Sequence, residues 1–148
     1  MNSQITPIER KKKKKILVVD DEPDARELFV ELISTNEDYE VMGATDGIDA
    51  LQKASENKFD LILLDIIMPK MDGVDTLTAL KNNKEKYGDS MVIMLTNIGG
   101  DIAVEKALEL GAIGFKLKID TEPEELLKTI NDALTTSKII SSTPKSLF

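Results

Sequence analysis

The chain of 148 residues contains neither cysteine nor histidine. Without cysteine it can form no disulfide bridge, thiolate metal site or cysteine nucleophile, which is typical of proteins of a reducing compartment. Without histidine it has no imidazole for acid–base catalysis or zinc binding, and it cannot itself carry a phosphohistidine. These two absences exclude several classes of enzyme and metal site before any motif is considered.

Long apolar runs are also missing. No stretch approaches the roughly eighteen apolar residues that a membrane-spanning helix needs, and the N-terminus lacks the apolar core of a signal peptide. We therefore expect no membrane span and a cytoplasmic location. With 41% hydrophobic and 31% charged residues, the composition is that of a globular protein. The length predicts one domain, at residues 14–136, between a disordered basic tail at 1–13 and a flexible tail at 137–148.

The net charge of -8 is unevenly distributed. Residues 1–15 carry a net charge of +5, because Arg10 and Lys11 to Lys15 outnumber Glu9, which leaves -13 for the remaining chain. A strongly acidic body argues against nucleic acid as the main partner. The lysine run is able to contact phosphate groups or anionic lipid, but such runs are more often solvated tails, and we adopt that interpretation.

Short apolar segments alternate with segments of helical periodicity. The expected strands are 16–19, 39–44, 60–65, 90–95 and 113–118. The expected helices are 23–35, 46–57, about 74–80, 102–111 and 122–134, the third of which fades into a polar stretch. In the first two helices the periodicity places Leu28 and Ile48 among the inward residues. Strands that alternate with helices of this length predict an α/β fold, a doubly wound parallel sheet with helices on both faces.

Polar side chains follow four of these strands at their carboxyl ends, where ligands bind in open α/β sheets. They are Asp20, Asp21, Asp65, Thr96 and Lys118. Three gathered carboxylates repel one another unless a hard cation binds them, and Mg²⁺ suits such a site because it keeps several waters and accepts a phosphate oxygen. A lysine and a hydroxyl opposite them are able to hold an anion. Because carboxylates serve as phosphate-accepting nucleophiles, this set predicts an aspartyl phosphate.

Each of these residues has a simpler role when it is taken alone. Asp20 or Asp21 would serve as a helix N-cap, and Asp65 would stabilise the Met-Pro turn that follows it. Thr96 would be an ordinary loop hydroxyl, and Lys118 a solvated lysine. The functional interpretation depends on their joint placement, which five independent accidents explain poorly.

The segments ILVVDDEPDARELF, LILLDIIMPKMDG, MLTN and LGAIGFKLK resemble the receiver domain of response regulators in two-component signalling, over about residues 14–136. The resemblance implies a flavodoxin-like sheet of strand order 2-1-3-4-5 and a stand-alone protein like the chemotaxis regulators. It also implies that Asp65 is phosphorylated and that Asp21 and Asp65 bind Mg²⁺ directly with the backbone carbonyl of Ile67. Asp20 would act largely through water.

The same resemblance assigns Thr96 and Lys118 to contacts with the phosphoryl group, and Phe115 with Thr96 to the switch. We choose Lys118 over Lys116 because we expect Lys116 on the other face of its strand. The resemblance further implies a sensor histidine kinase or histidine phosphotransfer protein as the phosphodonor. The chain would be a signalling phosphoacceptor that assists its own phosphorylation and dephosphorylation, and not a conventional enzyme. Once phosphorylated, it would change its partner binding through the fourth helix, fifth strand and last helix. The expected output partner is a separate protein or a second copy.

Two positions depart from the pattern of the family. Ile119 follows the lysine where proline in a cis peptide is usual, and Asn97 follows the threonine where a small residue is common. If these changes spoil the site, a phosphorylation-independent scaffold is the alternative. A Mg²⁺-dependent phosphohydrolase is a second alternative, but such enzymes have an aspartate at the position that Ile67 occupies here. Nucleotide binding is disfavoured because no GxxxxGK loop is present.

Overall fold

The computed structural model describes residues 12–97, 102–119 and 121–135. Its strands are β1 (Lys14–Val19), β2 (Tyr39–Ala44), β3 (Leu61–Asp65), β4 (Met91–Thr96) and β5 (Gly114–Leu117). Its helices are α1 (Pro23–Ser34), α2 (Gly47–Glu56), α3 (Gly73–Asn82), α4 (Lys84–Tyr87), α5 (Ile102–Glu109) and α6 (Pro123–Thr135). Nearly all of the two predicted tails, residues 1–11 and 137–148, lies outside the described residues, so the domain limits stay predictions.

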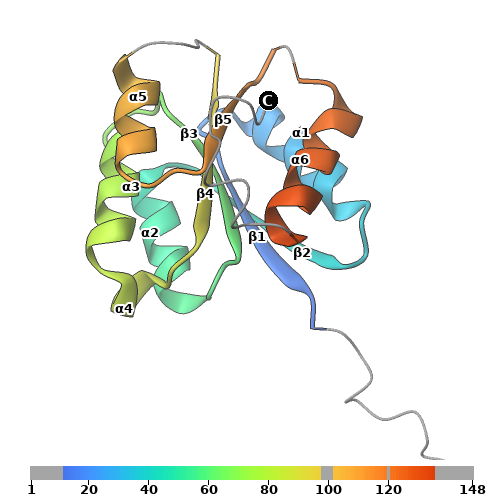
Figure 1. Ribbon diagram of the computed structural model, residues 1–148, viewed down its shortest axis with the longest axis horizontal. Helices are drawn as coiled ribbons and strands as arrows, with labels where there is room; N and C mark the ends of the chain where they lie inside the picture. The colour runs from blue at the N-terminus through green and yellow to red at the C-terminus, as the bar shows by residue number, and fades with distance from the viewer. Residues whose placement is uncertain (1–11, 98–101, 120, 136–148) are drawn as a thin grey trace, which may run out of the picture.

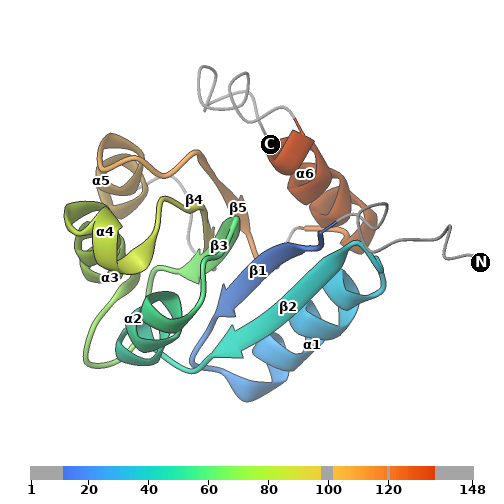
Figure 2. The same cartoon turned by 90° about the horizontal axis from the view of Figure 1, so that it is seen from below.

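The five strands form one parallel sheet of order β2-β1-β3-β4-β5, which confirms the predicted fold. Helices α1 and α6 cover one face of the sheet, and the other helices cover the opposite face (Figure 1). Figure 2 shows β2 at one edge, beside α1. β3 is the central strand, and all five of its residues are buried, which explains its almost wholly apolar sequence.

Two apolar cores lie on the two faces of the sheet. Because successive side chains of a strand point to opposite faces, Leu17 and Val19 pack into the core beneath α2, α3 and α5. Ile16 and Val18 pack into the core beneath α1 and α6. This arrangement buries the apolar runs completely and leaves the strand ends as the places where polar residues meet.

Helix boundaries follow local signals, with two corrections to the expected helix faces. Leu28 and Ile48 were expected to point inward, but they are 62% and 54% exposed. In α1 the buried positions are Phe29 and Ile33, one turn apart, and Leu28 lies beyond the edge of this narrow stripe.

The polar stretch after α3 also contains a short helix, α4, that periodicity did not predict. The side chain of Asn83 caps this helix by accepting a hydrogen bond from the backbone N–H of Lys86.

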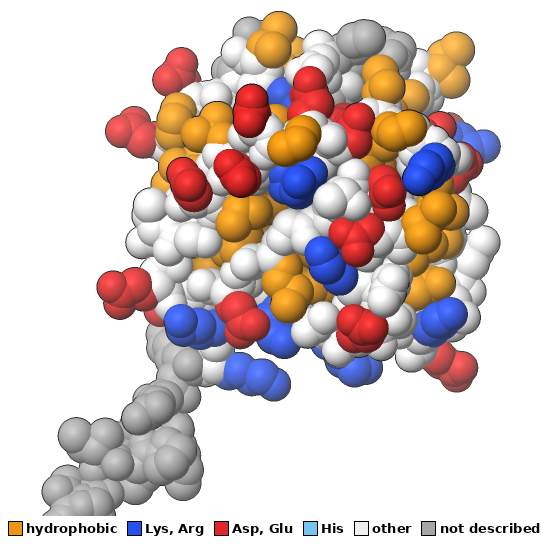
Figure 3. Space-filling view, turned by 180° about the vertical axis from the view of Figure 1, so that it is seen from behind, with side chains coloured by type: hydrophobic (Ala, Val, Ile, Leu, Met, Phe, Trp, Pro, Cys, Tyr) orange, Lys and Arg blue, Asp and Glu red, His pale blue; other side chains and the backbone are white. Residues whose placement is uncertain are grey.

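The lysine run is described from Lys12 onward. Lys12 to Lys15 and Lys58 line a hollow at the amino ends of the strands, together with Glu56 and Asp60. Figure 3 shows lysine and arginine side chains gathered along the lower edge of one face, interspersed with acidic ones. Within the described ranges, no helix is long and apolar enough to cross a membrane.

Candidate functional site

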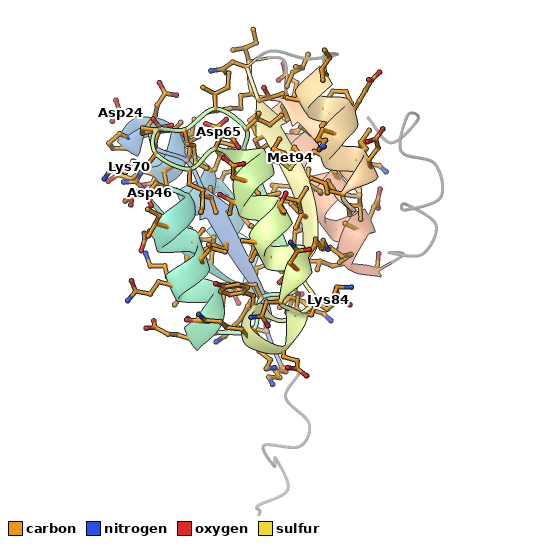
Figure 4. All side chains as sticks on the ribbon, turned by 90° about the vertical axis from the view of Figure 1, so that its left-hand side faces the viewer. Asp24, Asp46, Asp65, Lys70, Lys84 and Met94 are labelled. Carbon is orange, nitrogen blue, oxygen red and sulfur yellow. The ribbon has the colours of Figure 1, made fainter. Side chains whose placement is uncertain are left out.

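The register of the sheet brings the three predicted aspartates together. Val19 of β1 is paired with Leu64 of β3, so the chain reaches Asp20 and Asp65 side by side at the carboxyl edge. One carboxylate oxygen from each of Asp20, Asp21 and Asp65 lies within 4.8 Å of the others. Figure 4 shows Asp65 at one end of the sheet and Lys84 toward the other. The predicted acidic cluster therefore exists, and it is formed by the ends of two adjacent strands.

Lys118 bridges two of these carboxylates. Its Nζ lies 2.7 Å from Asp20 Oδ2 and 3.3 Å from Asp65 Oδ2, and its side chain is 6% exposed. The backbone N–H of Lys118 donates to the carbonyl of Thr96 at 2.8 Å, which fixes the turn after β5. Burial lowers the pKa of Lys118, but contacts with Asp20 and Asp65 outweigh that effect and raise the pKa overall. The lysine is thus held as a cation.

The carboxyl group of Asp65 has a strongly shifted pKa. Burial raises its pKa from 3.8 to about 6, against the opposing attraction of Lys118, and repulsion from Asp20 adds to the increase. The backbone N–H of Ile67 donates a hydrogen bond to the carboxyl group and lowers the pKa slightly. One lysine therefore does not neutralise the cluster, and the ionised form of Asp65 is costly in the protein alone.

The donor set fits a hard divalent cation. Asp20 Oδ2 is buried and, among the described residues, accepts no well-aligned hydrogen bond, although the Lys118 ammonium is close. A pocket of about 270 Å³ opens beside the cluster and is lined by Asp21, Glu22, Asp65, Ile67 and Asn97. Carboxylate and carbonyl oxygens are the ligands that Mg²⁺ prefers, and the pocket has space for the waters that Mg²⁺ retains.

Thr96 lies on β4 and Phe115 lies on β5, the two strands that follow β3 in the sheet. Thr96 is the last residue of β4 and is 1% exposed. Phe115 is half-buried in β5 and packs against the core beneath α2, α3 and α5. The predicted contact of Thr96 with a phosphoryl group and the predicted switch role of Thr96 and Phe115 stay predictions.

Asn97 and Ile119, the two positions that depart from the expected pattern, lie at the rim of the site. Asn97 is exposed and lines the pocket, where its side chain can narrow access to Asp65. Ile119 is 76% exposed. Within the described ranges no peptide bond is cis, so the peptide bond between Lys118 and Ile119 is trans.

Lys116 does point away from the cluster, but our reason for expecting this was wrong. Residues two apart share a face of a regular strand, so alternation does not separate Lys116 from Lys118. The separation arises because β5 ends at Leu117 and Lys118 lies in the following turn. Lys116 is 4% exposed, and its Nζ lies 2.7 Å from Glu125 Oε2 in α6.

Two residues of the site region were not predicted. Glu22 Oε1 lies 3.6 Å from Lys118 Nζ and lines the pocket; its position next to the acidic pair was the available signal. Arg26 Nη1 donates to the backbone carbonyl of Asp20 at 2.7 Å, and no sequence signal indicated that contact. Glu22 is also the N-cap residue of α1. Asp20 Oδ1 accepts the Glu22 backbone N–H at 3.0 Å, so neither aspartate caps the helix.

Comparisons with known proteins agree with this geometry. A family model described as the response regulator receiver domain matches residues 16–131. The uncharacterized transcriptional regulatory protein YhcZ of Bacillus subtilis is 40% identical over 116 residues, which cover 78% of this chain and 52% of that protein. The nitrate/nitrite response regulator protein NarL of Escherichia coli K12 is 39% identical over 127 residues, covering 85% and 57%. The chain thus spans about half the length of these curated relatives.

Solved structures show the same fold. The chemotaxis protein CheY4 of Vibrio cholerae matches with 33% sequence identity and a TM-score of 0.73, covering 80% of this chain and 97% of that one. The response regulator domain of Thermotoga maritima CheB matches with 31% identity and a TM-score of 0.73, covering 84% and 98%. Both likenesses extend over nearly the whole of the solved chains.

Proposed function

This chain belongs to the response regulator receiver domain family, and we propose that it is a phosphorylation switch whose phosphoacceptor is Asp65. The donor is the phosphohistidine of a sensor histidine kinase or of a histidine phosphotransfer protein, because the chain has no histidine of its own. The observation that supports the proposal most is the clustering of three carboxylates within 4.8 Å of one another, two of them in contact with a buried lysine. A purely structural role explains such a concentration of charge poorly.

The phosphoryl transfer is a direct displacement. A carboxylate oxygen of Asp65 forms a bond to phosphorus as the bond from phosphorus to the donor imidazole nitrogen breaks, and the imidazole leaves with the electron pair and takes up a proton. Lys118, 3.3 Å from Asp65 Oδ2, is placed to hold an oxygen of the arriving group. Asp65 is the nucleophile because it ends the central strand beside the pocket.

A cation completes the site. Asp20, Asp21, Asp65 and the backbone carbonyl of Ile67 would hold Mg²⁺, which supplies positive charge against the charge on the transferring oxygens. The protein's own contribution is to position the nucleophile and to preorganise these charges, so that the site assists its own phosphorylation. Asn97, which lines the pocket, limits the entry of water to the phosphorylated carboxylate.

Phosphorylation changes the balance between two arrangements of the domain. A phosphoryl group on Asp65 gives Lys118 and Thr96 a new anionic partner, and it favours the arrangement in which Thr96 and Phe115 move toward the site. The surface of α5, β5 and α6 then changes its affinity for a partner. That partner is an output domain or protein, or a second copy of the chain.

Intact mass measurement tests the proposal. The chain is incubated with acetyl phosphate in the presence of Mg²⁺ or of EDTA, with Asp65→Asn alongside. We expect a single phosphate adduct that requires Mg²⁺ and is absent from the variant. If the folded wild-type protein binds Mg²⁺ but gains no phosphate from acetyl phosphate or from a phosphorylated histidine kinase, the chain is a receiver-fold scaffold and the proposal is wrong.

A further inference from the structure

Arg26 connects α1 to the turn that carries the acidic pair. Its Nη1 donates a hydrogen bond to the backbone carbonyl of Asp20 at 2.7 Å, a short, charge-assisted contact. Within the described part of the chain, Arg26 forms no ion pair with any carboxylate, although it contacts the turn that carries two aspartates of the acidic cluster. Its guanidinium therefore binds the backbone of the turn and leaves the acidic side chains free for other partners.

Gly43 of β2 makes room for this contact. The Cγ and Cδ atoms of Arg26 lie 3.2 Å from the position that a Cβ atom on Gly43 would occupy. The backbone of Gly43 is outside the left-handed region, so glycine is not required there for conformational reasons. What a larger side chain would disturb is the path of the arginine across the strand.

The hydrogen bond fixes the direction of Asp21. The carbonyl of Asp20 and the amide of Asp21 belong to one planar peptide unit, so holding the carbonyl also sets the orientation of that unit. Asp20 itself is held by Lys118, which lies 2.7 Å from its Oδ2, and by two hydrogen bonds, from its N–H to the Ala44 carbonyl at 3.1 Å and from the Glu22 N–H to its Oδ1 at 3.0 Å. By contrast, the Asp21 carboxylate has no hydrogen-bond partner among the described residues, so the orientation of its backbone is the main constraint that keeps it beside Asp20 and Asp65.

We propose that Arg26, with Gly43 beneath it, is a positioning residue that preorganises Asp21 for Mg²⁺. This inference rests on the proposed function, since it concerns the same metal site. Loss of the hydrogen bond lets the peptide between Asp20 and Asp21 rotate, and binding of the cation must then restore its orientation. The consequence is a weaker affinity for Mg²⁺ with little effect on phosphorylation once Mg²⁺ saturates the site.

Three variants probe the contact in different ways. Arg26→Met keeps the alkyl packing on Gly43 but removes the hydrogen-bond donors. Arg26→Lys keeps a cationic donor on a shorter side chain. Gly43→Ala leaves the arginine unchanged but adds a methyl group against its side chain. Lys53→Met is the control: Lys53 Nζ donates to the carbonyl of Gly43 at 2.7 Å, so the control removes a bond from a cationic side chain to a backbone carbonyl of β2 and leaves the turn at Asp20 and Asp21 untouched. Folding of each variant is followed by circular dichroism and urea unfolding.

The affinity for Mg²⁺ is measured by calorimetric titration, and the rate of adduct formation with acetyl phosphate is measured at saturating Mg²⁺. We expect Arg26→Met and Gly43→Ala to raise the Mg²⁺ dissociation constant at least fivefold. The dissociation constant of Arg26→Lys should lie between those values and that of wild type. The dissociation constant of Lys53→Met should stay within twofold of that of wild type. At saturating Mg²⁺, Arg26→Met and Gly43→Ala should form the phosphate adduct at the wild-type rate. Equal affinities in folded Arg26→Met, Gly43→Ala and wild type would overturn the positioning role alone. Failure of the wild-type protein to bind Mg²⁺ would instead overturn the proposed function.

Discussion

Replacing Asp65 with asparagine should stabilise the metal-free protein at neutral pH. Burial holds the pKa of Asp65 at about 6 in the fold, against 3.8 for the ordinary side chain. At about 1.4 kcal/mol for each tenfold change in proton affinity, keeping Asp65 ionised in the fold costs about 3 kcal/mol. Asparagine carries no charge and still offers an oxygen to Lys118, so Asp65→Asn should gain about 1 to 3 kcal/mol in the free energy of unfolding.

The pH dependence follows from the sign of this shift. Because the folded pKa is raised, the folded state binds the proton more tightly than the unfolded state between about pH 4 and pH 6. Stability due to this group is therefore lost as the pH rises through that window, and the full penalty is present above about pH 6. Near pH 4 the advantage of the asparagine variant should shrink to less than about 1 kcal/mol.

Urea unfolding in EDTA, followed by far-ultraviolet circular dichroism near pH 7 and near pH 4, measures both effects. Asp75→Asn is the control, since Asp75 is an exposed acid in the first turn of α3, and its loss should cost at most about 0.5 kcal/mol. Mg²⁺ should raise the stability of wild type and leave Asp65→Asn nearly unchanged. A variant less stable than wild type in EDTA near pH 7, or an equal difference at both pH values, would refute the electrostatic reasoning.

Four further substitutions have defined expectations. Lys116→Met replaces a buried charge with an apolar side chain and should be neutral or stabilising by about 1 to 4 kcal/mol, whereas Glu125→Ala removes the carboxylate that lies 2.7 Å from the buried ammonium and should destabilise; urea unfolding distinguishes the two directions. Gly73→Ala places a Cβ 2.2 Å from the Asp65 carbonyl oxygen and should cost at least about 2 kcal/mol and slow phosphorylation. Lys70 has a φ of 70°, so Lys70→Gly should raise the free energy of unfolding by about 0.5 to 1 kcal/mol; a decrease would contradict this.

Much of the site was predictable from the sequence because it lies at strand ends. An apolar run that stops at a polar residue marks both the strand and its carboxyl terminus, and parallel strands bring these termini to one edge. Asp20, Asp65, Thr96 and Lys118 were all placed in this way. The spacing of the residues alone carried that prediction, and the resemblance to receiver domains added the roles.

Features that depend on side-chain direction were less predictable. Periodicity identifies the apolar stripe of a helix but not its exact width, which is why Leu28 and Ile48 were expected to be buried and are exposed. The different directions of Lys116 and Lys118 follow from the point at which β5 ends, which differs from the predicted strand end by one residue. The reach of Arg26 to a backbone carbonyl depends on the packing of α1 against β2, and no local pattern encodes it.

Chemical identification of the phosphorylated residue tests the central claim most directly. Borohydride reduces an aspartyl phosphate to homoserine, and peptide mass mapping of the reduced chain then locates the modified position. The account predicts homoserine at position 65 alone, after reaction with acetyl phosphate and Mg²⁺, and none after reaction in EDTA. Homoserine at position 20 or 21, or a phosphate that survives borohydride because it is on a hydroxyl group, would contradict the assignment of Asp65 as the phosphoacceptor.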